Sequence, residues 1–117
     1  MKNHILVINN NLEDIEKIKN ILGKVYRITI VKSTQKALEV VKDDTPDLVL
    51  VDISLIRISE DEFIKIIKKN KKLYKIPIIF IAASLRYKDE ELNMELGAID
   101  FLRKPIESEI MLKIIKL

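Results

Sequence analysis

The chain has 117 residues, a length typical of a single domain that is large enough to bury its own hydrophobic core. It contains no cysteine, which excludes disulfides, thiolate metal sites and cysteine nucleophiles and favours a cytoplasmic protein. The longest apolar runs are only as long as a strand, so we expect neither a signal peptide nor a membrane span. The net charge of +3 is modest, and the lysines between Lys65 and Lys75 are typical of a solvated helix face, so nucleic acid is not an expected partner of this domain alone.

The first third of the chain alternates between strand and helix patterns. An apolar run before Asn9 indicates a buried strand, and Asn11 is suited to cap the helix that follows. Glu13 and Asp14 in the first turn favour the dipole of that helix, and Gly23 ends it. The predicted elements are the strand His4–Ile8, a helix with Leu12, Ile15, Ile18 and Leu22 on its apolar face, the strand Tyr26–Val31, and a helix that Ser33 or Thr34 caps and Asp43–Pro46 ends. The single histidine, His4, is expected to be structural or exposed.

The rest of the fold is organised around Leu48–Asp52, four consecutive apolar residues followed by a carboxylate. An apolar run of this length is typical of a strand that is buried on both faces in the middle of a parallel sheet. Asp52 therefore stands at the carboxyl end of the strand, which is the edge where ligands bind in open α/β sheets.

The second half of the chain repeats the alternation with less regular patterns. Ser59–Glu62 has the Ser-x-x-Glu form of a capping box, and Phe63, Ile66 and Ile67 are expected to form the buried face of the helix behind it. Pro77 suits the first position of a strand because it cannot donate a ladder hydrogen bond. The remaining predicted elements are the strand Ile78–Ala82, a weaker helix from Tyr87 to Leu96, the strand Ile99–Leu102, and a final helix whose apolar positions are Ile106, Ile110, Ile114 and Leu117.

Five strands that alternate with five helices through short connections predict an α/β fold, in which one parallel sheet is covered on both faces. We expect residues 1–117 to form one domain with a crevice at the carboxyl ends of the strands. The residues placed there are Asn9, Asn10, Asp52, Ala82 and Lys104.

These segments together resemble the receiver domain of bacterial two-component response regulators, and the resemblance covers the whole chain. The segments that carry it are Leu48–Asp52, Pro77–Ala83, Gly97-Ala98 with the aromatic Phe101, and Lys104-Pro105 before the last helix. The resemblance implies a flavodoxin-like fold with the strand order 2-1-3-4-5, which comes from the family and not from the sequence pattern.

In that family, the aspartate at the position of Asp52 takes a phosphoryl group from a histidine kinase. The resemblance also implies a Mg²⁺ site made of Asp52, the backbone carbonyl of Ser54 and an acidic pair, which Asn9 and Asn10 replace here. Because Mg²⁺ sheds its water reluctantly and is held by carboxylates, this replacement is expected to weaken metal binding. Of the five usual active-site positions, only Asp52 and Lys104 keep the family's residues.

The resemblance therefore implies a degenerate receiver, a protein-interaction module in signal transduction that is not an enzyme, needs no cofactor and works without phosphorylation. Its expected partner is a protein, bound through the face made by the fourth helix, the fifth strand and the fifth helix. The alternative is a phosphoacceptor in a phosphorelay, in which a histidine kinase phosphorylates Asp52 despite weak Mg²⁺ binding. A small flavin-binding domain would share the strand order, but the hydroxyl-rich phosphate loop it needs after the first strand is absent.

Two expectations about the crevice follow. Lys104 should reach Asp52 and pair with its charge. Because Asp52 is left as the only expected carboxylate ligand in the crevice, no divalent metal should bind there. The alternative is that Asp52 only caps a turn and Lys104 only neutralises its charge. Ala82 stands where the family has the Thr or Ser of its switch. Phe101 is therefore expected to be buried against Ala82 in one rotamer. This would hold the partner-binding surface in the shape of an activated receiver without phosphorylation.

Overall fold

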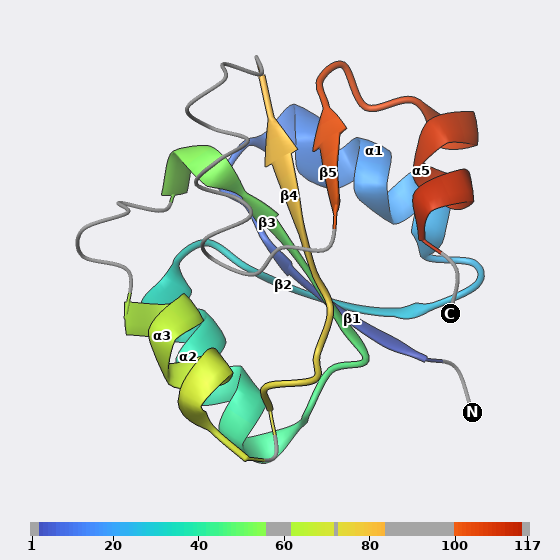
Figure 1. The fold of residues 1–117 in the computed structure, drawn as a ribbon. Helices are drawn as coiled ribbons and strands as arrows, with labels where there is room; N and C mark the ends of the chain where they lie inside the picture. Colours follow the sequence, from blue (N-terminus) through green and yellow to red (C-terminus); the bar gives the residue numbers. More distant parts are fainter. Residues whose placement is uncertain (1–2, 56–61, 72, 84–99, 116–117) are drawn as a thin grey trace.

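The computed structural model describes residues 3–55, 62–71, 73–83 and 100–115. Five parallel strands form one sheet in the order β2-β1-β3-β4-β5, which confirms the fold class and the strand order that the resemblance implied (Figure 1). The strands are β1 (His4–Ile8), β2 (Arg27–Val31), β3 (Leu48–Asp52), β4 (Ile78–Ala82) and β5 (Asp100–Arg103).

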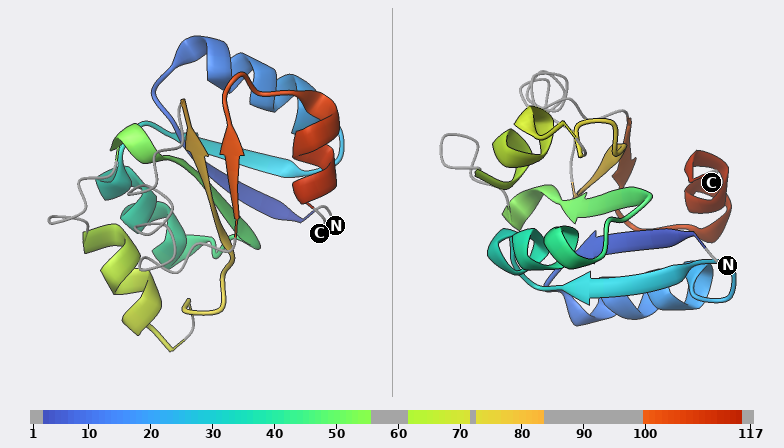
Figure 2. Two further views of the ribbon diagram at one scale, coloured as in Figure 1. Left: turned by 45° about the horizontal axis from the view of Figure 1, so that its top comes forward. Right: turned by 90° about the horizontal axis from the view of Figure 1, so that it is seen from below.

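Helices cover both faces of the sheet (Figures 1 and 2). One face carries α1 (Leu12–Leu22) and α5 (Ser108–Ile114), the other carries α2 (Thr34–Asp43) and α3 (Glu62–Lys69), and the short 3₁₀ turn η1 (Ile53–Leu55) follows β3. The helix expected from Tyr87 to Leu96 and most of the predicted capping box lie outside the described residues. Within the described ranges, no helix is long and apolar enough to cross a membrane.

The core consists of two layers, one on each face of the sheet. Every residue of β1, β3 and β4 is buried, which agrees with the unbroken apolar runs of these central strands. On one face they pack against Ala37, Val41 and Ile67 of α2 and α3. On the other face they pack against side chains of α1 and α5, among them Ile18, Leu22 and Met111.

The buried faces of three helices differ from the predicted ones. Ile66, Ile110 and Leu12 were expected to point inward, but they are 42%, 48% and 71% exposed. In α5 the reason is a shift of phase: Ile106 precedes the helix and does not share its period, so Met111 is the residue buried within it. Leu12 is the first residue of α1 and lies beyond the packed part of that helix.

Gly23 ends α1 where the chain approaches itself closely. A Cβ atom at this position would lie 2.5 Å from the carbonyl oxygen of Lys19, a backbone atom that cannot move independently. We expect Gly23→Ala to lower the free energy of unfolding by about 1–3 kcal/mol, because the helix end must shift to relieve the overlap. Urea denaturation measures the change, and an unchanged midpoint would contradict the predicted overlap.

His4 is buried in β1 and not exposed. Its Nε2 lies 2.7 Å from Thr29 Oγ1, and its backbone N–H donates to Asp47 at 2.7 Å. Burial and the nearby charge of Arg27 lower the pKa of His4, and they outweigh the opposite effect of Asp44 and Asp47. The folded protein therefore holds His4 neutral at a pH where the unfolded chain already takes up a proton.

This difference predicts a pH dependence of stability. Between the ordinary histidine pKa of about 6.5 and the lower pKa in the folded protein, the unfolded state binds more protons, so stability falls as the pH falls. His4→Gln keeps a polar side chain next to Thr29 and removes the titration. The slope of urea stability against pH should be smaller in His4→Gln between about pH 7.5 and pH 5.5, and equal slopes in the two proteins would contradict the assignment.

Candidate functional site

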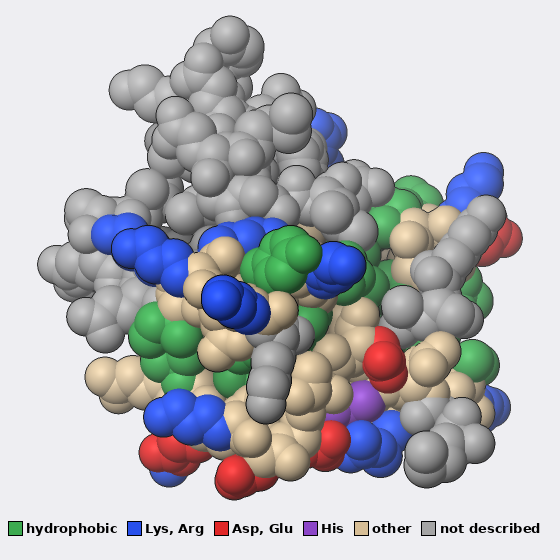
Figure 3. Space-filling model, turned by 60° about the horizontal axis from the view of Figure 1, so that its bottom comes forward, with side chains coloured by type: hydrophobic (Ala, Val, Ile, Leu, Met, Phe, Trp, Pro, Cys, Tyr) green, Lys and Arg blue, Asp and Glu red, His purple; other side chains and the backbone are tan. Residues whose placement is uncertain are grey.

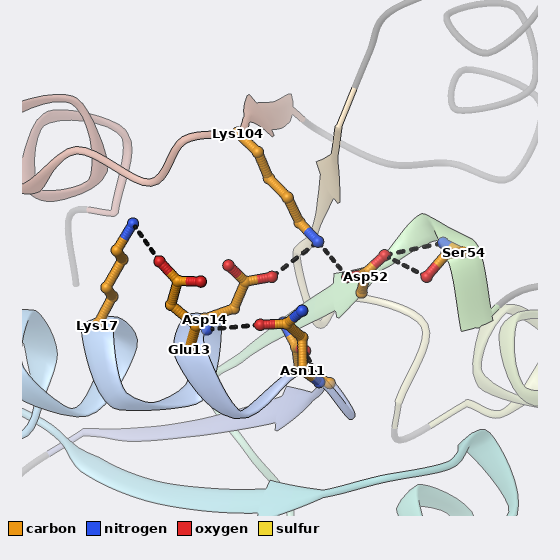
Figure 4. Close-up of polar contacts among 8 residues, drawn as sticks. Asn11, Glu13, Asp14, Lys17, Asp52, Ser54 and Lys104 are labelled. Atoms are coloured by element: carbon orange, nitrogen blue, oxygen red, sulfur yellow. Dashed lines mark hydrogen bonds and ion pairs between the residues drawn. The ribbon is translucent and has the colours of Figure 1, made fainter.

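Three charged side chains meet at the carboxyl end of the sheet (Figure 4). Asp52 is the last residue of β3, Lys104 directly follows β5, and Asp14 lies in the first turn of α1. The Lys104 ammonium lies 2.9 Å from Asp52 Oδ2 and 2.7 Å from Asp14 Oδ2. One lysine therefore bridges two carboxylates that come from distant parts of the chain, and the expected contact between Lys104 and Asp52 is confirmed.

Asp52 is buried, and both of its carboxylate oxygens have partners. Its Oδ2 accepts a hydrogen bond from Lys104, while Oδ1 accepts from the backbone N–H of Ser54 at 2.9 Å and from its hydroxyl at 2.7 Å. Burial acts to raise the pKa of Asp52, but the hydrogen bonds from Lys104 and Ser54 together outweigh it and hold the pKa below its ordinary value. The carboxylate is therefore ionised near neutral pH.

Lys104 is positioned by the end of the sheet. Its backbone N–H donates to the carbonyl of Ala82 at 2.8 Å, which continues the pairing of β4 and β5 by one residue. Burial acts to lower the pKa of Lys104, but its contacts with Asp14 and Asp52 raise it above the ordinary lysine value. The contact with Asp14 is an ion pair whose angles fall outside those of a hydrogen bond.

The turn between β1 and α1 places Asp14. Asn9 Oδ1 accepts from the backbone N–H of Asn11 at 2.8 Å, and Asn11 caps the helix by accepting from the backbone N–H of Asp14 at 2.9 Å. In a capping box, the side chain at the position of Asp14 turns back to the N–H of the cap residue. Here Asn9 already takes that N–H, so the Asp14 carboxylate can extend toward Lys104.

Asp14 corrects the prediction that Asp52 is the only carboxylate in the crevice. From the sequence, Asp14 was predicted only to stabilise the dipole of α1. In the structure its side chain is just 11% exposed and lies in the crevice. The sequence does contain a feature that indicates this position: Asp14 stands three residues after the cap of a helix that starts at the crevice. Side chains in the first turn of a helix lean back toward its N-terminus, which places the Asp14 carboxylate near the crevice.

Asn9 and Asn10, which the resemblance aligns with the family's acidic pair, lie differently. Asn9 is fully buried, and its Nδ2 has no hydrogen-bond partner among the described residues. Asn10 is exposed. In the part of the chain that the structure describes, no group of three or more His, Cys, Asp or Glu side chains lies close enough to hold a metal ion.

The predicted switch positions are described only in part. Ala82 is fully buried at the end of β4. The backbone of Phe101 pairs with Phe80 between β4 and β5. The side chain of Phe101 lies outside the described residues, so its packing against Ala82 remains a prediction.

Residues 5–116 match the response regulator receiver domain family. A relative from Vibrio cholerae, described as a probable cyclic di-GMP phosphodiesterase, is 35% identical over 107 residues, which are 92% of this chain but 24% of the relative. The polar-differentiation response regulator DivK from Brucella ovis is 26% identical over 117 residues, which are 99% of this chain and 95% of DivK. The chain thus spans about a quarter of the first relative and nearly all of the second.

The fold agrees with these matches. A response regulator from Chloroflexus aurantiacus has a crystal structure that superimposes with a TM-score of 0.86 at 22% identity, covering 97% of this chain and 93% of that one. The family match extends over almost the whole sequence, and the sheet order, Asp52 at the end of β3 and Lys104 after β5 fit it. This chain belongs to the response regulator receiver domain family.

Proposed function

We propose that this receiver is an atypical one, a signalling and protein-interaction module that works without phosphorylation and is not an enzyme. The observation that carries the proposal is the position of the Lys104 ammonium between Asp14 and Asp52. Two carboxylates and one ammonium leave a single net negative charge in the crevice. Aspartates in place of Asn9 and Asn10 would add two negative charges beside the same lysine, so the crevice as it is attracts a divalent cation much less.

The residues around the crevice do not fit a Mg²⁺ site. Mg²⁺ needs oxygen ligands in near-octahedral geometry, and it prefers carboxylates. Both oxygens of Asp52 accept hydrogen bonds, Asn9 Oδ1 accepts from Asn11, and the Asp14 oxygen that faces the crevice contacts Lys104. A metal ion would have to displace the lysine and break the bonds to Ser54.

The proposed partner surface includes β5, α5 and the fourth helix that the sequence predicts from Tyr87 to Leu96, which lies outside the described residues. Ile110 and Leu112 of α5 are 48% and 45% exposed, although both are large apolar side chains. Neither is needed for the core, because Met111 and Ile115 supply the packing of α5. The two side chains lie on opposite flanks of α5, two residues apart, and the apolar surface that each exposes supports a role of α5 in binding a protein.

The alternative function is that of a phosphoacceptor. It is favoured by one observation: Asp52 stands at the family's phosphorylation position and is ionised, as a nucleophile must be. In this case a histidine kinase would phosphorylate Asp52 in spite of weak Mg²⁺ binding.

Incubation with Mg²⁺ and acetyl phosphate, followed by intact-mass measurement, separates the two functions. The proposal predicts that the mass does not change, in the chain as it is and in Asp52→Asn alike. The gain of one phosphoryl group that is absent in Asp52→Asn would contradict the proposal and support the phosphoacceptor.

A further inference from the structure

A basic surface lies away from the crevice, on α3 and the turn that follows it. Its exposed lysines are Lys65, Lys69, Lys71 and Lys75, and we call this surface the α3 basic face. The sequence contains no Asp or Glu from Phe63 to Lys88, so no acidic side chain of this stretch offsets these charges. Figure 3 shows the end of the molecule where Lys and Arg side chains surround exposed hydrophobic ones.

The α3 basic face also has an apolar part. Ile66 is 42% exposed and lines a groove of about 370 Å³ together with Lys65, Lys69 and Asn70. Tyr74, in the turn after α3, is 48% exposed. Ile67 of the same helix is fully buried against the sheet, while the exposed part of Ile66 faces the groove.

The charge and the shape of this face together define the ligand that would complement it. The lysines are complementary in charge to carboxylates, and the groove at Ile66 can accept an apolar side chain. Nucleic acid fits less well: Lys75 Nζ lies 5.8 Å from the centre of the Tyr74 ring, so a cation of the protein itself already occupies one of the two ring faces on which a base would stack. A flat membrane surface would not fill a groove.

We propose that the α3 basic face binds an acidic segment of a partner protein, in which carboxylates flank at least one apolar side chain. The face is independent of the proposed partner surface on α5, because α3 and α5 cover opposite faces of the sheet (Figure 2). It is also distant from the crevice, since the turn after α3 lies at the other end of the strands (Figure 1).

The test uses a fluorescent amphipathic peptide in which glutamates flank a stripe of leucines, with anisotropy measured at low and at physiological salt. The expected result is saturable binding that weakens with salt. The double variant Ile66→Ser with Lys69→Glu should raise the dissociation constant about tenfold or more, because it removes both the apolar and the charged contact. Both residues are exposed, and thermal unfolding of the variant checks that the fold is kept.

The matched control is Val25→Ser with Lys24→Glu, which makes the same kinds of change at exposed positions of the turn after α1, away from both proposed binding surfaces. It should bind the peptide as the unchanged chain does. Three results would overturn the proposal: no saturable binding at low salt, an equal loss in the control variant, or tighter binding of single-stranded DNA or of vesicles that contain phosphatidylserine. Because neither variant touches the crevice, these outcomes are separate from the phosphorylation test.

Discussion

Replacing Lys104 with methionine is expected to lower the free energy of unfolding at neutral pH by about 3–5 kcal/mol, because it leaves two buried carboxylates without a cation. The side chains of Asp14 and Asp52 are only 11% and 4% exposed, so water solvates the two carboxylates poorly once the ammonium is removed. The loss should shrink at low pH, since protonation of the two carboxyl groups removes the uncompensated charge. Urea denaturation near pH 7 and near pH 3 measures both effects.

Two comparisons make this prediction specific to the crevice. Adding Asp14→Asn and Asp52→Asn to Lys104→Met should recover most of the lost stability, because no buried charge then remains. Lys17→Met breaks a surface pair with Glu13 at 3.7 Å and should cost less than about 1 kcal/mol. If Lys104→Met and the triple variant were equally stable, the three side chains would not interact as described.

The second large effect is expected when Asn9 and Asn10 are both replaced by aspartate. An aspartate at position 9 keeps the oxygen that accepts from Asn11 and removes the Nδ2 donor, which has no partner among the described residues, but it adds charge beside Asp14 and Asp52. Without metal, the repulsion should lower stability. With Mg²⁺ at about one hundred times its dissociation constant, binding to the folded state should raise the free energy of unfolding by about 2.7 kcal/mol.

Thermal unfolding with and without Mg²⁺ tests this expectation. The midpoint of the aspartate variant should rise with the Mg²⁺ concentration, while that of the unchanged chain should respond no more than it does to an equal ionic strength of NaCl. A Mg²⁺-specific rise of the same size in the unchanged chain would show that Asn9 and Asn10 do not limit metal binding.

The fold could be predicted because its signals are local and repeated. The runs that form β1, β3 and β4 are apolar without interruption, and the cap residues Asn11 and Ser33 stand where the helices begin. The strand order could not be derived in this way, since periodicity does not specify which strands are neighbours. It came from the family resemblance.

The crevice was predictable only in part. Asp52 and Lys104 were identified because each follows a strand and fits a family motif, and the structure places them in contact. Asp14 was missed because its direction depends on a competition for one backbone N–H, that of Asn11, which Asn9 wins. Such a competition between side chains is decided by three-dimensional geometry, and no repeating pattern in the sequence reveals its outcome.

The helix faces show a similar limit. Ile66 and Ile67 are adjacent and equally apolar, and only the packing against the sheet determines that Ile67 is buried. His4 is a comparable case, because its burial depends on Thr29 of the neighbouring strand β2. Contacts between strands that are far apart in the chain cannot be inferred from local patterns alone.

The most direct test of the proposal that the crevice binds neither Mg²⁺ nor a phosphoryl group is a titration of the ¹⁵N-labelled chain with Mg²⁺ and then with beryllofluoride. It is observed through the backbone amides of Asn10, Asp52, Ser54 and Lys104. If Lys104 holds Asp14 and Asp52 together as described, these amides should show no saturable shift at millimolar Mg²⁺ and no new set of signals with beryllofluoride. Saturable shifts at Asp52 and Asn10, followed by a stable beryllofluoride complex, would contradict the account and establish Asp52 as a working phosphoacceptor.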